Sequence, residues 1–237
     1  MQNLYSAMWF ESFLDTIQPA QTELEIAFIA RHLPQPAYTA VLDVCCGQGR
    51  HARLLAARRY RVTGVDFNRA ALDKARRDSN GQVTYIEADM RRLTDLPGSF
   101  DAVVNLWQSF GYFDEAANAD ILRQIGQKLN HAGRLILDIY HRGFFEQHQG
   151  SRSFERQGRT IVETKVMNGR RLTVRLDYND SALSDVFDWQ LYTPDEICLQ
   201  AGQFGFVPLV ICTEFEETKP ASADNPRMQL VFEKTGK

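Results

Sequence analysis

The sequence has few cysteines, and none of them is spaced for metal binding. Its four cysteines are Cys45, Cys46, Cys198 and Cys212. No two of them show the short spacing that zinc ligands need, and they make no disulfide framework. We therefore expect reduced thiols that are buried as small apolar side chains, and no bound metal.

The sequence also lacks a long apolar run and a basic leader. No stretch approaches the roughly 20 apolar residues that a transmembrane helix needs. The first residues contain no basic region followed by an apolar segment, so we expect no signal peptide. These absences predict a cytoplasmic protein that has no membrane partner.

Neither sign of charge dominates, because the formal net charge is −3. Such a chain creates no overall field that would attract nucleic acid. Arginines do gather locally, for example at residues 58–61 and 76–77. The solvated faces and ends of helices explain these groups better than an RNA-binding patch does, so we predict no nucleic-acid partner.

The chain does contain enough apolar residues for one large α/β domain. It has 237 residues, of which 44 % are apolar, so a sizeable core needs no metal or disulfide. From residue 41 onward, strand and helix patterns alternate, which is typical of a parallel sheet with helices on both faces. The expected strands cover residues 41–45, 61–65, 83–88, 100–106, 135–139, 206–211 and 228–232.

Two segments depart from this alternation. Residues 1–36 are helical and rich in aromatics, and they predict either a helix packed on the domain or a lid over a ligand site. Residues 151–192 hold short, half-polar strands, and Asn168-Gly169 is a hairpin signal between two of them. We expect a single domain over residues 1–237, with a mostly parallel seven-stranded sheet and an antiparallel insertion after the fifth strand.

The stretch from Val41 to Ala52 carries the main binding signal. A buried strand leads into a turn with Gly47 and Gly49, and a helix begins near Arg50. Glycine lets a ligand approach the backbone closely, and the helix points unpaired N–H groups at the same place. Asp43 lies inside the apolar strand, where a carboxylate is costly unless it is hydrogen-bonded. Its expected partners are N–H groups of the turn or the ammonium group of a ligand.

Acids follow the next strands at the same edge of the sheet. Asp66 ends the second strand, 17 residues after Gly49, close to the ~20-residue spacing of nucleotide-binding folds, and it can accept both hydroxyls of a ribose. Asp89 and Met90 follow the third strand, where an acid can bind an adenine amino group. The segment 105–113 follows the fourth strand. Taken together, these features predict a site for an adenosine-like ligand.

These segments resemble the motif series of class I S-adenosylmethionine-dependent methyltransferases. The resemblance covers roughly residues 20–140, and fragments such as Cys-Cys-Gly-Gln-Gly-Arg-His and Ser-Phe-Gly-Tyr-Phe look like a bacterial small-molecule methyltransferase-domain subgroup. It implies a Rossmann-like fold, S-adenosylmethionine as cofactor and methyl transfer to a small-molecule acceptor. Nucleic-acid amino methyltransferases usually carry Asn/Asp-Pro-Pro-aromatic after strand four, whereas this chain has Asn105-Leu106-Trp107-Gln108.

The resemblance also implies which residues contact the cofactor. The expected contacts are Asp43, Cys45, Gly47 and Gly49 around the methionine part, Asp66 at the ribose, and Asp89 and Met90 at the adenine. Phe67 beside the ribose acid and Asn105 at the end of the fourth strand complete the set. The family often has glycine where Cys45 stands, so this chain loses one freely bending backbone position.

Two other functions fit parts of the same pattern. Residues 47–52 read GxGxxA, and Asp66 could serve the ribose of NAD(P) in an oxidoreductase. Asp43 and Asp89-Met90 have no obvious role with a dinucleotide, so we favour the methyltransferase. A binding protein that holds S-adenosylmethionine without catalysis is the third possibility.

The acceptor side is expected at the ends of strands four and five. A hydroxyl or carbon acceptor would need a general base, for which His141 and Tyr140 are the candidates, whereas a neutral amine needs no strong base. We expect the methyl group to be transferred to nitrogen or oxygen more than to carbon. We also expect the protein to be a monomer or a homodimer. The residues expected at the methyl group are Trp107, Gln108, Ser109 and Tyr112, with Tyr5 and Trp9 covering it.

Overall fold

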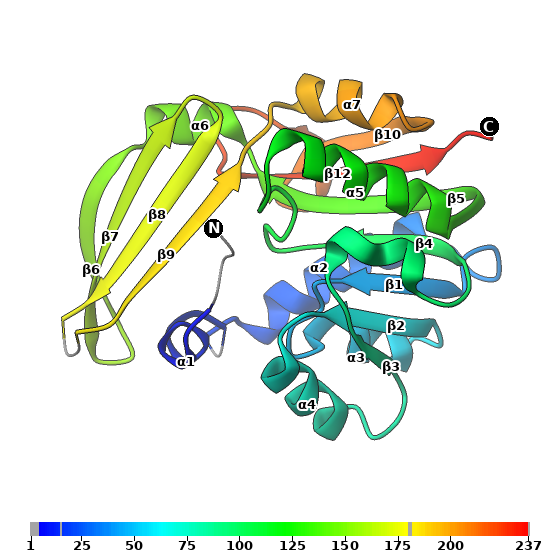
Figure 1. The fold of residues 1–237 in the computed structure, drawn as a ribbon, viewed down its shortest axis with the longest axis horizontal. Helices are drawn as coiled ribbons and strands as arrows, with labels where there is room; N and C mark the ends of the chain where they lie inside the picture. Colours follow the sequence, from blue (N-terminus) through cyan, green and yellow to red (C-terminus); the bar gives the residue numbers. More distant parts are fainter. Residues whose placement is uncertain (1–4, 15, 180–181, 237) are drawn as a thin grey trace.

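A computed structural model describes residues 5–14, 16–179 and 182–236 of the chain. Two sheets stand side by side (Figure 1). The strands of the larger sheet are β1 (Ala40–Val44), β2 (Arg61–Asp66), β3 (Thr84–Glu87), β4 (Phe100–Asn105), β5 (Leu129–Tyr140), β10 (Phe206–Thr213), β11 (Glu216–Pro220) and β12 (Arg227–Lys234). The smaller sheet contains β6 (Gly150–Arg156), β7 (Arg159–Asn168), β8 (Arg171–Tyr178) and β9 (Ser184–Gln190).

The helices flank the larger sheet or join its strands. The short elements are α1 (Ala7–Trp9), the π-helix η1 (Phe10–Leu14) and the 3-10 helix η2 (Met90–Asp95). The longer helices are α2 (Pro19–His32), α3 (Arg50–Ala57), α4 (Arg69–Asp78), α5 (Glu115–Lys128), α6 (Arg142–Gln147) and α7 (Pro194–Gly202). Among the described residues, every helix is too short or too polar to cross a membrane.

The larger sheet confirms the predicted fold class. Its order is β11-β10-β12-β5-β4-β1-β2-β3, and the first five strands of the chain run parallel. β12 is antiparallel to β5, and β10 is antiparallel to β12. All seven predicted strands are present in this sheet. The sheet has eight strands, because β11, which was not predicted, pairs at its edge. The sequence of β11 is polar and exposed at every position, so it carries no strand periodicity.

Side-chain alternation along the central strands divides the core in two. On β5, Leu135 and Leu137 belong to the core beneath α5 and α7, whereas Ile136 between them belongs to the core beneath α2, α3 and α4. Successive side chains of a strand point to opposite faces, so one apolar run fills both layers. The central strands β1 and β4 are therefore buried on both faces, and their ends remain open to a ligand.

The smaller sheet is the predicted antiparallel insertion, and it covers residues 150–190. β7 and β8 form the hairpin around Asn168-Gly169, and β9 was also expected. The outer strand β6 was not predicted, because its polar sequence has no clear alternation. The insertion stands beside the carboxyl ends of the parallel strands, with α1 between the two sheets (Figure 1).

Two stretches of the sequence have the spacing of a capping box, at Thr22–Glu25 and Thr193–Glu196, and each predicts a helix start. Only the second prediction is confirmed. α7 begins as predicted: the side chain of Thr193 accepts the N–H of Glu196, and the Glu196 carboxylate accepts the N–H of Thr193 at 2.9 Å. α2 instead begins at Pro19, so Thr22 lies inside the helix. Proline suits the first helical position, which explains the earlier start.

We expect Thr193→Ala to lower the free energy of unfolding by about 1 kcal/mol, because it removes the oxygen that caps α7. Chemical denaturation monitored by circular dichroism measures the change. Thr193→Ser keeps a capping hydroxyl and serves as the matched control. Equal stability of the alanine variant and the parent chain would contradict the assigned cap.

Candidate active site

The turn after β1 has a left-handed backbone at three positions. Cys45, Gly47 and Gly49 have φ of +61°, +53° and +73°. Glycine adopts such angles without steric cost, whereas the non-glycine residue pays roughly 1–2 kcal/mol. At Gly49, a Cβ atom would lie 2.2 Å from the hydroxyl oxygen of Tyr85. Cys45 therefore takes the strained conformation at the position where related sequences often have glycine.

Asp66, at the end of β2, ties this turn to the next loop. One carboxylate oxygen accepts the N–H of Gly47 at 2.8 Å, and the other accepts the N–H of Asn68 at 2.8 Å. Burial raises the pKa of Asp66, although these N–H groups and that of Phe67 oppose the rise. Each carboxylate oxygen has a second lone pair, so Asp66 can still accept hydroxyl groups from a ligand.

Asp43 carries a buried oxygen that no described residue satisfies. The side chain is 3 % exposed, and its Oδ2 has no hydrogen-bond partner within the described residues. Burial, and then the charge of Asp66, raise the pKa of Asp43 to about 7, against the opposing effect of Arg50. An unpaired buried carboxylate is costly, and Asp43 faces a cavity. The site therefore fits a ligand that brings an ammonium group.

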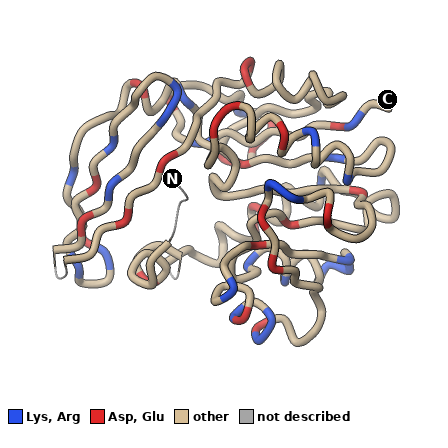
Figure 2. Tube along the Cα trace, viewed as in Figure 1, with Lys and Arg blue, Asp and Glu red and all other residues tan. Residues whose placement is uncertain are grey.

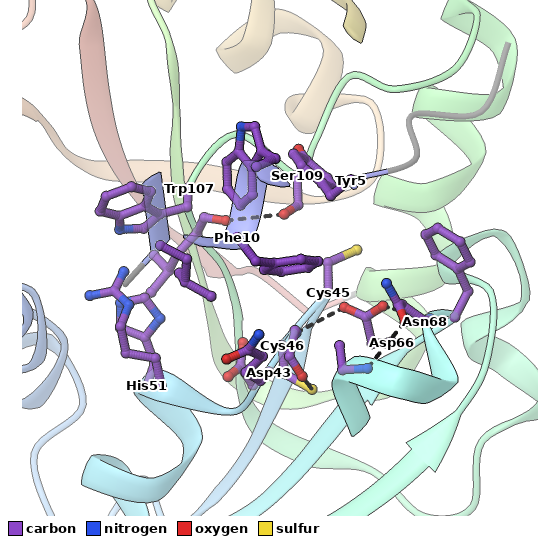
Figure 3. A pocket seen from close by; sticks show the side chains of 18 of the residues that line it. Tyr5, Phe10, Asp43, Cys45, Cys46, His51, Asp66, Asn68, Trp107 and Ser109 are labelled. Carbon is purple, nitrogen blue, oxygen red and sulfur yellow. Dashed lines mark hydrogen bonds between the residues drawn. The ribbon is translucent and has the colours of Figure 1, made fainter. Parts of the chain in front are cut away.

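These groups form one wall of a cavity of about 870 Å³, which we call the strand-tip cavity. Its other walls come from segments 106–112 and 5–14. Figure 3 shows Tyr5 and Trp107 across the cavity from Asp43 and Asp66, with Phe10 between them. The lining residues are Tyr5, Trp9, Phe10, Leu14, Asp43, Cys45, Cys46, Gly47, Gln48, Arg50, His51, Asp66, Phe67, Asn68, Ala71, Leu106, Trp107, Ser109 and Tyr112.

A smaller cavity of about 350 Å³ continues the first one toward β3, and we call it the β3 cavity. Cys45, Phe67 and Tyr112 line both cavities, so the two are adjacent. Asp89 and Met90 lie on its far side. The β3 cavity thus brings the predicted adenine contacts next to the predicted ribose contact.

The carboxylate of Asp89 is held in place by its neighbour. It accepts the backbone N–H of Arg91 at 2.9 Å and the side-chain Nε–H at 3.0 Å. These bonds lower the pKa of Asp89, so it remains ionised at neutral pH. This pairing with Arg91 is compatible with the position of Asp89 on the wall of the β3 cavity.

A third cavity lies between the insertion and the end of β5, and we call it the insertion cavity. It measures about 1180 Å³. Its lining residues are Tyr5, Trp9, Phe13, Trp107, Gln108, Tyr140, Phe144, Phe145, Arg152, Glu163, Lys165, Val174, Leu176, Phe187, Trp189, Pro226 and Arg227. Tyr5, Trp9 and Trp107 also line the strand-tip cavity, so the two cavities meet at these three rings.

The N-terminal segment is fixed to both sheets. The hydroxyl oxygen of Tyr5 lies 2.5 Å from that of Tyr112, which follows β4. Ser6 donates its hydroxyl to Asp185 of β9 at 2.7 Å, and the ring of Tyr5 stacks on Phe187 at 4.7 Å. Segment 5–14 therefore covers the strand-tip cavity, as the predicted lid would.

Most of the predicted site residues line these cavities. Gln108 and Tyr140 line the insertion cavity, while Gly49, Asn105 and His141 are absent from the lining of all three. Asn105 donates to the carbonyl of Val44 at 3.0 Å and so braces β1. His141 is 6 % exposed and begins α6, a short helix that sequence patterns did not predict. Its role as general base stays a prediction.

Trp107 is held by a buried network of charged residues that no sequence pattern predicts. The indole N–H of Trp107 donates to Glu25 at 2.8 Å, and Glu25 also binds Arg50 and His51, each at 2.6 Å. Burial raises the pKa of Glu25, but these partners outweigh that effect and lower the pKa to about 2. The guanidinium groups of Arg50 and Arg227 lie 4.7 and 5.2 Å from the centre of the Trp107 ring.

A second buried acid anchors the same network from β5. Asp138 is fully buried; it accepts the backbone N–H of Trp107 at 3.0 Å and pairs with Arg227. Trp107 and Gln108 both have φ of +60°, so this anchor holds two non-glycine residues in a strained turn. Asp138 is a carboxylate inside an apolar strand, which is the same signal that singled out Asp43.

Comparisons with known proteins agree with this geometry. Residues 41–133 match the family described as "Methyltransferase domain". A putative methyltransferase of Bacillus subtilis, YqeM, is 29 % identical over 108 residues, which are 44 % of each chain. The chain spans about half the length of the curated relatives it matches.

Solved structures share the fold over nearly the whole chain. A S-adenosylmethionine-dependent methyltransferase from Clostridium acetobutylicum superposes with a TM-score of 0.81 at 14 % identity, covering 97 % of both chains. CalS10, a S-adenosylmethionine-bound amino pentose methyltransferase from Micromonospora echinaspora, has a TM-score of 0.72 at 22 % identity, covering 99 % of this chain and all of its own.

The fold is therefore that of class I S-adenosylmethionine-dependent methyltransferases. The match to the methyltransferase-domain family covers residues 41–133 of the 237 in the chain. The recognition made from the sequence motifs is confirmed, and so is S-adenosylmethionine as the cofactor of the class. The similar proteins named above are methyltransferases, which favours this function over the NAD(P) alternative.

We expect Asp66→Ala to weaken S-adenosylmethionine binding by about 100-fold or more, because two hydrogen bonds to a charged group contribute roughly 1.5–3 kcal/mol each. Isothermal titration calorimetry measures the affinity, and circular dichroism checks that the fold is retained. Asp95→Ala, at an exposed acid, is the matched control. Unchanged affinity in the Asp66 variant would defeat the placement of the ribose.

We expect cofactor affinity to depend on the ionisation of Asp43. Its raised pKa of about 7 means that the carboxylate takes up a proton as the pH falls through neutrality. Between about pH 8 and pH 6, affinity for S-adenosylmethionine should fall about tenfold, because the protonated acid loses its attraction for the ammonium group. In Asp43→Asn this pH dependence should vanish, and a retained tenfold fall would point to another group.

Proposed function

We propose that this chain transfers a methyl group from S-adenosylmethionine to a nitrogen or oxygen atom of a small-molecule acceptor. The observation that carries the proposal is the junction of the strand-tip cavity with the insertion cavity at three aromatic rings. One cavity has the polar groups of a cofactor site, and the other has room for an acceptor.

Different residues of the chain contact different parts of the cofactor. Asp43 faces the ammonium group, Asp66 receives the ribose hydroxyls, and the β3 cavity with Asp89 and Met90 accepts the adenine. When bound, the cofactor supplies a methyl group that is already electrophilic because its sulfur is positively charged. The protein's task is then to align the acceptor atom, the methyl carbon and the sulfur in one line.

Alignment and exclusion of water explain the aromatic junction. Tyr5 and Trp9 cover the site from the N-terminal segment, while Trp107 is fixed by Glu25 and Asp138. Aromatic faces also suit a positively charged sulfonium group. Holding two reactants in a productive arrangement can contribute roughly 7–11 kcal/mol to catalysis, so positioning alone accounts for much of the rate.

Among the described residues that line the insertion cavity, none is suited to act as a general base at neutral pH. Burial raises the pKa of Tyr140, so its hydroxyl stays protonated. The carboxylate of Glu163 is already bound to Arg152 and Lys165. A neutral amine, which needs no strong base, therefore fits this site better than a hydroxyl group. The amino pentose methyltransferase among the similar structures is consistent with a nitrogen acceptor.

We expect saturating S-adenosylmethionine to raise the melting temperature by about 5–10 °C. A ligand at 100 times its dissociation constant stabilises the folded state by about 2.7 kcal/mol, and for a chain of this size that free energy corresponds to such a shift. Thermal-shift assays compare this cofactor with NAD, which should leave the melting temperature unchanged. A shift with NAD alone would overturn the proposal. Binding without turnover on a panel of small amines and alcohols would instead favour the non-catalytic binding protein.

A further inference from the structure

One face of the insertion forms the outer wall of the insertion cavity. Alternate residues of each strand point into it: Glu163 and Lys165 from β7, and Phe187 and Trp189 from β9. β8 contributes two aliphatic side chains between these strands. The antiparallel register places Arg152 of β6 opposite Glu163, so charged and aromatic groups occupy separate parts of one wall.

The aromatic part of the cavity suits a flat molecule. Tyr140 lies 4.7 Å from Phe145 and 5.7 Å from Trp189, measured between ring centres. Phe187 stacks on Trp189 at 5.6 Å with an interplanar angle of 27°. Rings held in mutual contact present fixed faces and edges, against which a planar, unsaturated body packs with little loss of freedom.

The charged part of the cavity is unusual because it is largely buried. The side chain of Glu163 is 12 % exposed and that of Lys165 is 18 % exposed, with 2.8 Å between carboxylate and ammonium. Arg152 also pairs with Glu163 and reaches the surface at 66 % exposure. Figure 2 shows that basic and acidic residues alternate with one another along the strands of the insertion. Buried pairs of this kind contribute little to stability, so their presence on an apolar wall indicates a role in binding.

The balance of these charges favours an anion. Glu163 is shared by two cations, Arg152 and Lys165, which leaves one positive charge in excess. On the inner wall, the charge of Arg227 is matched by Asp138. The cavity therefore carries one uncompensated positive charge, and the only carboxylate among its described lining residues is already neutralised.

We propose that the acceptor is a planar, conjugated molecule bearing an anionic group, carboxylate or phosphate, which binds at Lys165 and Arg152. This inference rests on the proposed function and names the acceptor class of the same site. The flat body packs among the rings of β9, α6 and Tyr140, and the atom to be methylated points toward Trp107. Glu163 pairs with both cations and offsets one of their two positive charges.

The fluorescence of the chain's own tryptophans can test this proposal. Its three tryptophans, Trp9, Trp107 and Trp189, all line the insertion cavity. Tryptophan fluorescence of the full-length protein with S-adenosylmethionine therefore reports on ligands that enter it. Four small aromatic probes differ mainly in charge: benzoate, phenyl phosphate, benzamide and benzylamine.

We expect benzoate or phenyl phosphate to bind about tenfold more tightly than neutral benzamide, which corresponds to one charged contact, and benzylamine to bind most weakly. Whichever anion binds more tightly identifies the acidic group as carboxylate or phosphate. Preference for benzylamine would overturn the proposal, because Glu163 would then attract a cationic acceptor. Equal binding of all four probes would also overturn it.

Variants with opposite expected effects make the test independent of general loss of structure. Lys165→Met should abolish the preference for the anion, whereas Glu163→Gln should increase it several-fold, because the cavity becomes more positive. Lys219→Met, at an exposed lysine of β11, is the matched control and should change nothing. An anion preference that survives the Lys165 substitution would refute the assigned contact.

The same variants separate this inference from the proposed function. Each should keep the thermal shift produced by S-adenosylmethionine, because none of the substituted residues lines the strand-tip cavity. Loss of anion preference with the thermal shift retained would leave the methyltransferase assignment standing and remove only the acceptor class. Absence of the thermal shift in the parent chain would instead remove the cofactor site itself.

Discussion

The carboxylate of Asp66 fixes the geometry on which the binding edge depends. By accepting the N–H groups of Gly47 and Asn68, it holds the turns after two neighbouring strands at a set separation. The strained backbone of Cys45 and the glycine turn are stable only because such bonds define the path of the chain. The acid expected to bind the ligand is therefore also the acid that shapes the place where the ligand binds.

Buried charge serves a comparable purpose on the other side of the strand-tip cavity. Glu25 and Asp138 hold Trp107 by its indole N–H and its backbone N–H, and guanidinium groups lie near the ring. Burying these ions costs solvation energy that pairing only partly returns, so stability alone does not explain them. A ring that separates two cavities must keep one orientation, and a network of directional bonds supplies it where apolar packing would allow several.

The sequence was sufficient to predict the parallel sheet and the row of acids at its edge. Both follow from local rules, since alternation of strands and helices sets the topology and parallel strands end at one edge. The predictions failed where position depends on distant contacts. β11 pairs through its backbone although its residues are polar, and α6 is a helix of only six residues. Neither feature leaves a periodic pattern in the sequence.

The network around Trp107 could not be predicted from the sequence for a different reason. Glu25, Arg50 and Arg227 come from distant parts of the chain, and each looks like an ordinary surface charge when read alone. Asp138 did carry a signal, because it interrupts an apolar strand as Asp43 does. A carboxylate in such a place must find a partner, so an unexplained acid in a core strand predicts a network even when its members cannot be named.

The N-terminal segment links the two halves of the site physically. Through Tyr5 it contacts the strand-tip cavity, and through Ser6 it is bonded to Asp185 on the insertion. Tyr5 and Trp9 line both cavities, so a movement that opens one changes the wall of the other. A ligand in either cavity would therefore contact the same two side chains. Under the proposed function, these side chains, which belong to neither sheet, would couple cofactor binding to acceptor binding.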